Sequence, residues 1–107
     1  MKWRITFFNE KVKSQALAFP KGILANFLHS LELLEEFGPS IGMPHIRPVS
    51  KGLYEVRAQG KEGVGRALYC VVPGRELVIV NVFIKKSRKT PVKEIRLAQK
   101  RMKQVTK

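Results

Sequence analysis

The sequence contains no aspartate, a single cysteine (Cys70) and two histidines among its 107 residues. Without aspartate the chain has no Ser/His/Asp catalytic set, and its histidines, cysteine and glutamates show no recognised metal-ligand spacing. A single cysteine excludes an intrachain disulfide and a cysteine-based zinc site, and its place in an apolar run predicts a buried, inert thiol. We therefore expect neither a metal ion nor another cofactor.

Long apolar runs are absent as well. No stretch approaches the ~18–20 apolar residues of a transmembrane helix, and Lys2 and Arg4 interrupt any apolar segment of a signal peptide. We expect one soluble, cytoplasmic domain over residues 1–107 with no membrane partner, although charge alone leaves association with a membrane surface open.

Positive charge is what the chain has in excess. It carries 21 Lys and Arg against eight Glu, a formal net charge of +13. Residues 85–107 alone hold ten of these cations against Glu94, so the excess belongs mainly to one end of the fold. Such a charge favours a polyanionic partner: nucleic acid, a membrane surface or an acidic protein.

Apolar periodicity predicts an α+β fold. We expect a strand over residues 3–8, a helix over 10–19 capped by Asn9, and a second helix from Pro20 to Phe37. The Pro- and Gly-rich residues 39–52 predict a loop. Three strands then form an antiparallel meander, over residues 53–58, 64–72 and 77–85. A final basic helix begins with Thr90 as its cap and Pro91 in its first turn.

Strand alternation assigns side chains to the two faces of the meander. In the last strand one set is wholly apolar and must meet the helices: Val78, Val80, Val82 and Ile84. The opposite face is predicted to be open and charged, and to bring together Glu55, Arg57, Arg66, Asn81 and Lys85.

A cluster of cations with one carboxylate suits phosphate chemistry. Arginine clamps a phosphate through two hydrogen bonds, and further cations stabilise charge in a phosphoryl transition state. RNA supplies its own nucleophile, the 2′-hydroxyl. The structural alternative is that Glu55 only pairs with Arg57 or Arg66 across the ladder, and that residues 85–89 form a solvated turn.

Several motifs together resemble one known family. They are Leu33-Leu34-Glu35-Glu36-Phe37-Gly38-Pro39, Gly52-Leu53-Tyr54-Glu55-Val56-Arg57, Arg66-x-x-Tyr69, Phe83-x-Lys85-Lys86-x-x-x-Thr90-Pro91 and Ile95-x-x-Ala98-x-x-Arg101. Across residues 1–104 the chain resembles the phage-derived HigB-like toxins of the RelE/ParE superfamily. The resemblance implies a RelE-like fold and a type II toxin encoded beside an antitoxin. It also implies an endoribonuclease that cuts mRNA, usually on the ribosome, and leaves a cyclic phosphate.

The resemblance also implies roles for individual residues. Arg57 and Arg66 would clamp the scissile phosphate, and Glu55 would orient the cations. Related nucleases often use a Tyr or His near the C-terminus as acid or base, and none follows Tyr69. The candidates left for proton transfer or charge stabilisation are Lys85, Lys86 and His45. Further RNA contacts are expected from Arg47, Arg88, Lys89, Lys93, Arg96 and Lys100.

Two other functions fit the same features. A ParE-like protein would poison gyrase by binding alone, without a phosphate-cleaving cluster. A basic RNA- or DNA-binding protein would need no catalysis at all, although the scarcity of aromatic residues disfavours a base-stacking platform.

Overall fold

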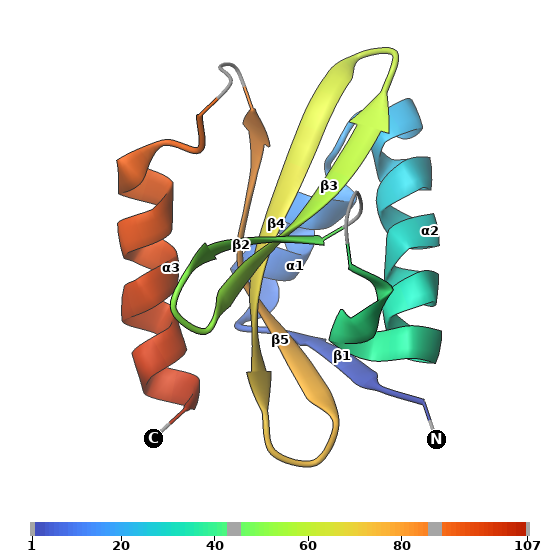
Figure 1. Cartoon of the computed structure of the whole chain (residues 1–107). Coiled ribbons are helices and arrows are strands. Elements are labelled where there is room, and N and C mark those ends of the chain that lie inside the picture. The colour runs from blue at the N-terminus through green and yellow to red at the C-terminus, as the bar shows by residue number, and fades with distance from the viewer. Residues whose placement is uncertain (1, 43–45, 86–88, 107) are drawn as a thin grey trace.

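The computed structural model describes residues 2–42, 46–85 and 89–106, which form one five-stranded sheet between helical layers (Figure 1). The elements in chain order are β1 (Arg4–Phe7), α1 (Glu10–Leu17), α2 (Lys21–Phe37), the 3-10 turn η1 (Gly38–Ile41), β2 (Ile46–Ser50), β3 (Leu53–Gly60), β4 (Gly63–Val72), β5 (Glu76–Lys85) and α3 (Val92–Val105). The strand order is β1-β5-β4-β3-β2; β1 runs parallel to β5, and the other pairs are antiparallel. The predicted α+β class is confirmed.

The N-terminal strand and both helices form where the sequence predicts them. The Asn9 side chain accepts a hydrogen bond from the Val12 N–H at 2.9 Å, which caps α1. Helix α2 begins after Pro20, and Gly38 ends it with φ +63°, a backbone conformation that glycine adopts without strain.

The prediction of a loop over residues 39–52 is wrong for its second half. Ile46–Ser50 forms β2, the edge strand beside β3, with Arg47 opposite Glu55. Pro48 lies within this strand, where it cannot donate a ladder hydrogen bond. An edge strand tolerates proline because one side of its backbone has no neighbouring strand.

The meander is confirmed, but one of its faces is not as predicted. In β5 the register steps from Asn81 opposite Leu68 to Ile79 opposite Tyr69, so Val80 is an extra residue in a bulge. The bulge resets the alternation of side chains. The four apolar residues predicted to share a face are therefore split: Val80 packs beneath α3, whereas Val82 joins the core under α1 and α2.

Two apolar cores hold the layers together. Helices α1 and α2 cover one face of the sheet and α3 covers the other, as Figure 1 shows. The predicted apolar stripe on the last helix is confirmed, and it packs into the core on the α3 side of the sheet through Ile95, Ala98, Met102 and Val105. Cys70 is buried in this second core, as predicted, and burial raises the pKa of its thiol.

Helix α3 is fixed on the sheet by polar contacts at the bulge. Asn81 donates its side-chain amide to the Glu94 backbone and side-chain oxygens, at 3.1 and 3.0 Å. Arg101 donates to the Val80 carbonyl at 2.7 Å and lies 5.2 Å from the centre of the Phe8 ring. The bulge therefore sets where α3 lies. Within the residues described, no helix is long and apolar enough to span a membrane.

Candidate functional site

Strand pairing brings four cations and one carboxylate to the α3 side of the sheet. Arg47 of β2 lies opposite Glu55 of β3, and Arg57 of β3 lies opposite Arg66 of β4. Directly opposed residues share a face, and Lys85 follows by alternation from Phe83, the partner of Arg66 in β5. We call the four cations the cation cluster.

Glu55 lies at the centre of the cluster. Its Oε1 is 3.0 Å from Arg66 Nη1, and the Thr90 hydroxyl donates to Oε2 at 3.1 Å. Glu55 is 1% exposed and Arg66 is 5% exposed. Hydrogen bonds to the remaining oxygens offset part of the desolvation cost of a buried ion pair, and Thr90 contributes one of them.

The expectation of an open charged face is therefore wrong in part. The five predicted residues do share a face, but Glu55, Arg66 and Asn81 are buried. The apolar stripe of α3 packs in one core with Leu53 and Leu68 on this face, and Thr90 lies against Glu55. Arg57 stays exposed and Lys85 half-exposed, so the cluster has a buried centre and an accessible rim.

Burial and mutual repulsion act on the basic groups. Burial lowers the pKa of Arg66; Glu55 opposes this, and the charges of Arg57 and Arg47 lower it further. The arginine stays protonated, because its ordinary pKa is so high. Burial likewise lowers the pKa of Lys85, and the positive charge of Arg66 is the next largest cause of the lowering. The charge of Glu55 raises this pKa, whereas those of Arg47 and Arg57 lower it further. Lys85 thus gives up its proton more readily than a solvated lysine.

One buried donor in the cluster has no partner. Arg66 Nε makes no hydrogen bond to any of the described residues. Leaving a buried N–H unpaired costs about 1–3 kcal/mol. Because this atom is buried, attraction of an anionic ligand depends on the charges of the exposed rim and not on this donor.

The other predicted site residues lie outside the cation cluster or outside the described part of the chain. Lys89 is exposed just before Thr90. Three cations form an exposed row on α3, at steps of three and four: Lys93, Arg96 and Lys100. Three predictions fall outside the described residues: His45, Lys86 and Arg88. Tyr69, part of the family motif, is buried on the opposite face and takes no part in the cluster.

Sequence reasoning missed the role of Thr90. The predicted helix cap is wrong, because α3 begins at Val92 and the Thr90 hydroxyl donates to Glu55 instead. Residues 55 and 90 belong to different elements, and no local pattern pairs them. Among the described residues, no group of three His, Cys or Glu side chains could hold a metal ion.

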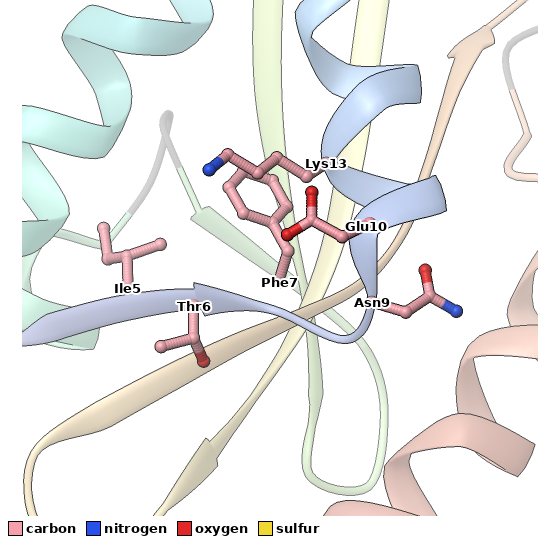
Figure 2. Close-up of a pocket in the computed structure, with 6 residues that line it drawn as sticks. All are labelled: Ile5, Thr6, Phe7, Asn9, Glu10 and Lys13. Carbon is pink, nitrogen blue, oxygen red and sulfur yellow. The ribbon is translucent and has the colours of Figure 1, made fainter.

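Two surface hollows differ in their relation to the cluster. One, of about 240 Å³, lies beside it between β2 and the start of α3. The other, of about 470 Å³, lies between β1 and α1 and holds one cation and one anion, Lys13 and Glu10 (Figure 2). No cluster residue lines this second hollow, so the chemistry of the cluster points to the smaller one.

Known proteins match this chain at the level of family and fold. A family model described as "Phage derived protein Gp49-like (DUF891)" matches residues 15–103, a span that includes the whole cluster. One similar solved structure is the crystal structure of an archaeal RelE–RelB complex from Pyrococcus horikoshii OT3. The match has a TM-score of 0.58 at 20% identity and covers 83% of this chain and 100% of that one. No curated protein matches.

Proposed function

This chain belongs to the phage-derived Gp49-like family of RelE-type toxins, and from that membership we propose that it is an endoribonuclease that cuts mRNA, bound on the ribosome. The observation that supports this most directly is the cation cluster around Glu55. Cations placed around a phosphate stabilise the charge that develops in a phosphoryl-transfer transition state. The reaction requires no metal ion, because the RNA provides its own nucleophile.

In the proposed reaction the RNA 2′-oxygen attacks the adjacent phosphorus and loses its proton to solvent water. The bond from phosphorus to the 5′-oxygen breaks, and that oxygen gains a proton. The products are a 2′,3′-cyclic phosphate and a free 5′-hydroxyl, with no oxidation or reduction.

We infer the role of each residue in this reaction partly from its exposure. Arg57 and Arg47 are exposed and can contact phosphate oxygens. Arg66 is buried beneath these residues and adds its positive charge without direct contact. Lys85, with its lowered pKa, protonates the 5′-oxygen or stabilises its charge. Glu55 is held by Arg66 and Thr90, which suits an orienting group better than a general base.

Two measurements test the proposal. One is cleavage of RNA by the purified chain, and the other is the mapping of new 5′ ends on cellular mRNA after the protein is expressed. Cutting should survive EDTA in an RNA-only assay, or with ribosomes after brief chelation that leaves them intact. A 2′-deoxy nucleotide at the cut site should abolish cutting but not binding. Arg57→Ala and Arg57→Lys should each lose about 10²–10³ in rate, because lysine lacks the bidentate fork.

Lys11→Ala on α1 is the matched control: it removes one exposed cation away from the cluster and should cut normally. Normal cutting by Arg57→Ala together with Lys85→Ala would refute this site. Full toxicity without RNA cleavage, in the wild type as well, would favour a ParE-like gyrase poison instead.

A cognate antitoxin is part of the proposal. The similar solved structure from Pyrococcus horikoshii OT3 is a RelE–RelB complex, and a charge of +13 favours rapid association with an anionic partner. We expect an acidic or amphipathic antitoxin segment to cover the face that carries the cation cluster. Short single-stranded RNA should then compete with the antitoxin, whereas simultaneous binding of both would place the antitoxin elsewhere. A cytoplasmic location follows, because mRNA and ribosomes are there.

A further inference from the structure

The smaller hollow beside the cluster has the features of a ligand subsite. Its volume is about 240 Å³ and its lining consists of Arg47, Pro48, Val49, Lys89, Thr90 and Ile95. We propose that this β2–α3 hollow receives one nucleobase of the bound RNA, from the nucleotide next to the cleaved phosphodiester. The inference rests on the proposed function and adds to it a site that selects among bases.

The hollow is of a size for a single ring system. Pockets for drug-sized ligands begin at about 300 Å³, and this one is smaller. It can hold a base but not a dinucleotide or a peptide helix. The bound RNA must therefore place one base in the hollow and leave the sugar and phosphate of that nucleotide outside.

The lining matches a base and its phosphate. Pro48, Val49 and Ile95 provide an apolar surface, and Arg47 and Lys89 provide the charge. An apolar face accepts the flat surface of a base, and a guanidinium can stack on that base or hold its phosphate. None of the described residues that line the hollow is aromatic, so shape must contribute much of any preference among bases.

The walls are held in place before any ligand arrives. Gln99 of α3 donates its side-chain amide to the Ser50 hydroxyl at the end of β2, at 3.3 Å. A Cβ added to Gly52, in the next turn, would lie 3.7 Å from the Met102 sulfur, so backbone and helix are close there. A preformed cavity loses little ordering entropy when it binds.

Two residues join the hollow to the cation cluster. Thr90 lines the hollow and donates to Glu55, which in turn holds Arg66. Arg47 lines the hollow and lowers the pKa of Lys85 by its charge. A base in the hollow thus lies beside Arg47, a member of the cluster, and its adjoining phosphate falls among the other cations.

An antitoxin side chain is the competing occupant. The charges favour RNA, because the rim carries two cations and the apolar surface comes from only three side chains. A protein anchor would bury a larger apolar area in a central pocket.

The test compares probes that share a phosphate but differ in the base. Binding of nucleoside 3′-monophosphates, ribose 5-phosphate and inorganic phosphate to the purified full chain is followed by the NMR methyl signals of Val49 and Ile95. Nucleotides should bind about 10-fold more tightly than the abasic probes and should alone shift both methyl signals, because only nucleotides carry a base that can pack on the apolar lining. Equal affinities would overturn the proposal.

A matched pair of variants checks the location. Val49→Glu places an anion in the hollow and should abolish the advantage of nucleotides over ribose phosphate, whereas Val49→Thr keeps the shape and should retain most of it. If Val49→Glu keeps the full advantage while its unfolding curve matches that of the wild type, the base binds elsewhere. Methyl shifts produced by the purified antitoxin but by no nucleotide would also overturn the proposal, in favour of a protein anchor.

The proposed function can fail separately. Nucleotide binding in the hollow with no RNA cleavage by the wild type would leave the subsite standing and refute the endonuclease. Cleavage that tolerates an abasic residue at every position flanking the cut would refute the subsite alone.

Discussion

At the scale of single residues, Glu55 is the most constrained group in the site. Its carboxylate is fully surrounded, and its partners come from different parts of the chain, Arg66 in β4 and Thr90 before α3. A buried charge that loses its partner is far more costly than a pair that was never formed. The same pair therefore links the stability of the fold to the electrostatics of the site.

Removal of Arg66 should show that link. Arg66→Ala leaves Glu55 buried without its cation and should lower the free energy of unfolding by about 3–5 kcal/mol in urea titrations. Arg57 is exposed and lies opposite Arg66 in the strand ladder, so Arg57→Ala should change the free energy of unfolding by less than about 0.5 kcal/mol.

The double variant Glu55→Leu/Arg66→Met separates stability from chemistry. It replaces the pair by apolar side chains and should recover most of the lost stability without recovering RNA cleavage. An Arg66→Ala protein as stable as the wild type would show that the ion pair contributes nothing to the fold.

The pH dependence of cleavage should identify Lys85. If its protonated form is the active one, the rate falls on the alkaline side as Lys85 loses its proton. Arg57 lowers the pKa of Lys85 and Glu55 raises it. Arg57→Ala should thus move the alkaline limb to higher pH, and Glu55→Gln should move it to lower pH. Lys100→Ala on α3 should leave it in place.

Unfolding through deprotonation of Lys85 does not explain a fall in the cleavage rate at alkaline pH. The pKa of Lys85 is lower in the folded chain, so between the folded and unfolded pKa values the unfolded chain binds more protons. Stability from this group then rises with pH through that window. Pre-steady-state rates measured against pH are the appropriate data, and an alkaline limb that Arg57→Ala moves downward would exclude Lys85 as its source.

At the scale of elements, the β5 bulge decides what α3 covers. The extra residue, Val80, turns one apolar side chain toward α3, and its carbonyl accepts the Arg101 hydrogen bond. Asn81, the next residue, holds Glu94. The bulge thus anchors a helix that buries Glu55 and borders the β2–α3 hollow.

Loss of the Arg101 anchor should destabilise the fold. A hydrogen bond from a charged donor contributes about 1.5–3 kcal/mol. Arg101→Ala should lower the free energy of unfolding by about 2 kcal/mol in urea titrations, whereas Lys103→Ala, exposed on the same helix, should change it by less than about 0.5 kcal/mol. Equal effects of the two variants would mean that the bulge contact does not anchor α3.

At the scale of the whole molecule, charge is distributed unevenly around the fold. Residues 85–107 hold ten cations. Among those that the structure describes, five are exposed just before or along α3: Lys89, Lys93, Arg96, Lys100 and Lys103. This part of the chain therefore adds a basic surface beside the cluster. Long-range attraction of a polyanion depends on this arrangement more than on any single contact.

Salt dependence should reveal which cations contact RNA. Replacement of Lys85, Lys86, Arg88 and Lys89 by Ala should flatten the plot of log affinity against log salt by about 0.7 unit per lost contact, or about 3 units in all. The control removes four exposed lysines near the N-terminus: Lys2, Lys11, Lys13 and Lys21. If both quadruple variants change the slope equally, the attraction comes from net charge and not from a site.

The sequence by itself determined the local elements and much of the site. Apolar periodicity predicted the helices and the meander, and strand alternation brought Glu55, Arg57, Arg66 and Lys85 to one face. These predictions succeeded because helix and strand periods are local properties of the chain. The motif resemblance likewise agreed with the family that the chain belongs to.

Only the tertiary structure decided the rest. Residues 46–50 form a strand because β3 offers them an edge, and the bulge at Val80 follows from the pairing of β5 with β4. The Thr90 hydrogen bond to Glu55 joins residues 35 positions apart in the sequence. Burial of Glu55 and Arg66 depends on where α3 packs. Contacts of this kind depend on the partner segment as much as on the local sequence, so no pattern within a single stretch could predict them.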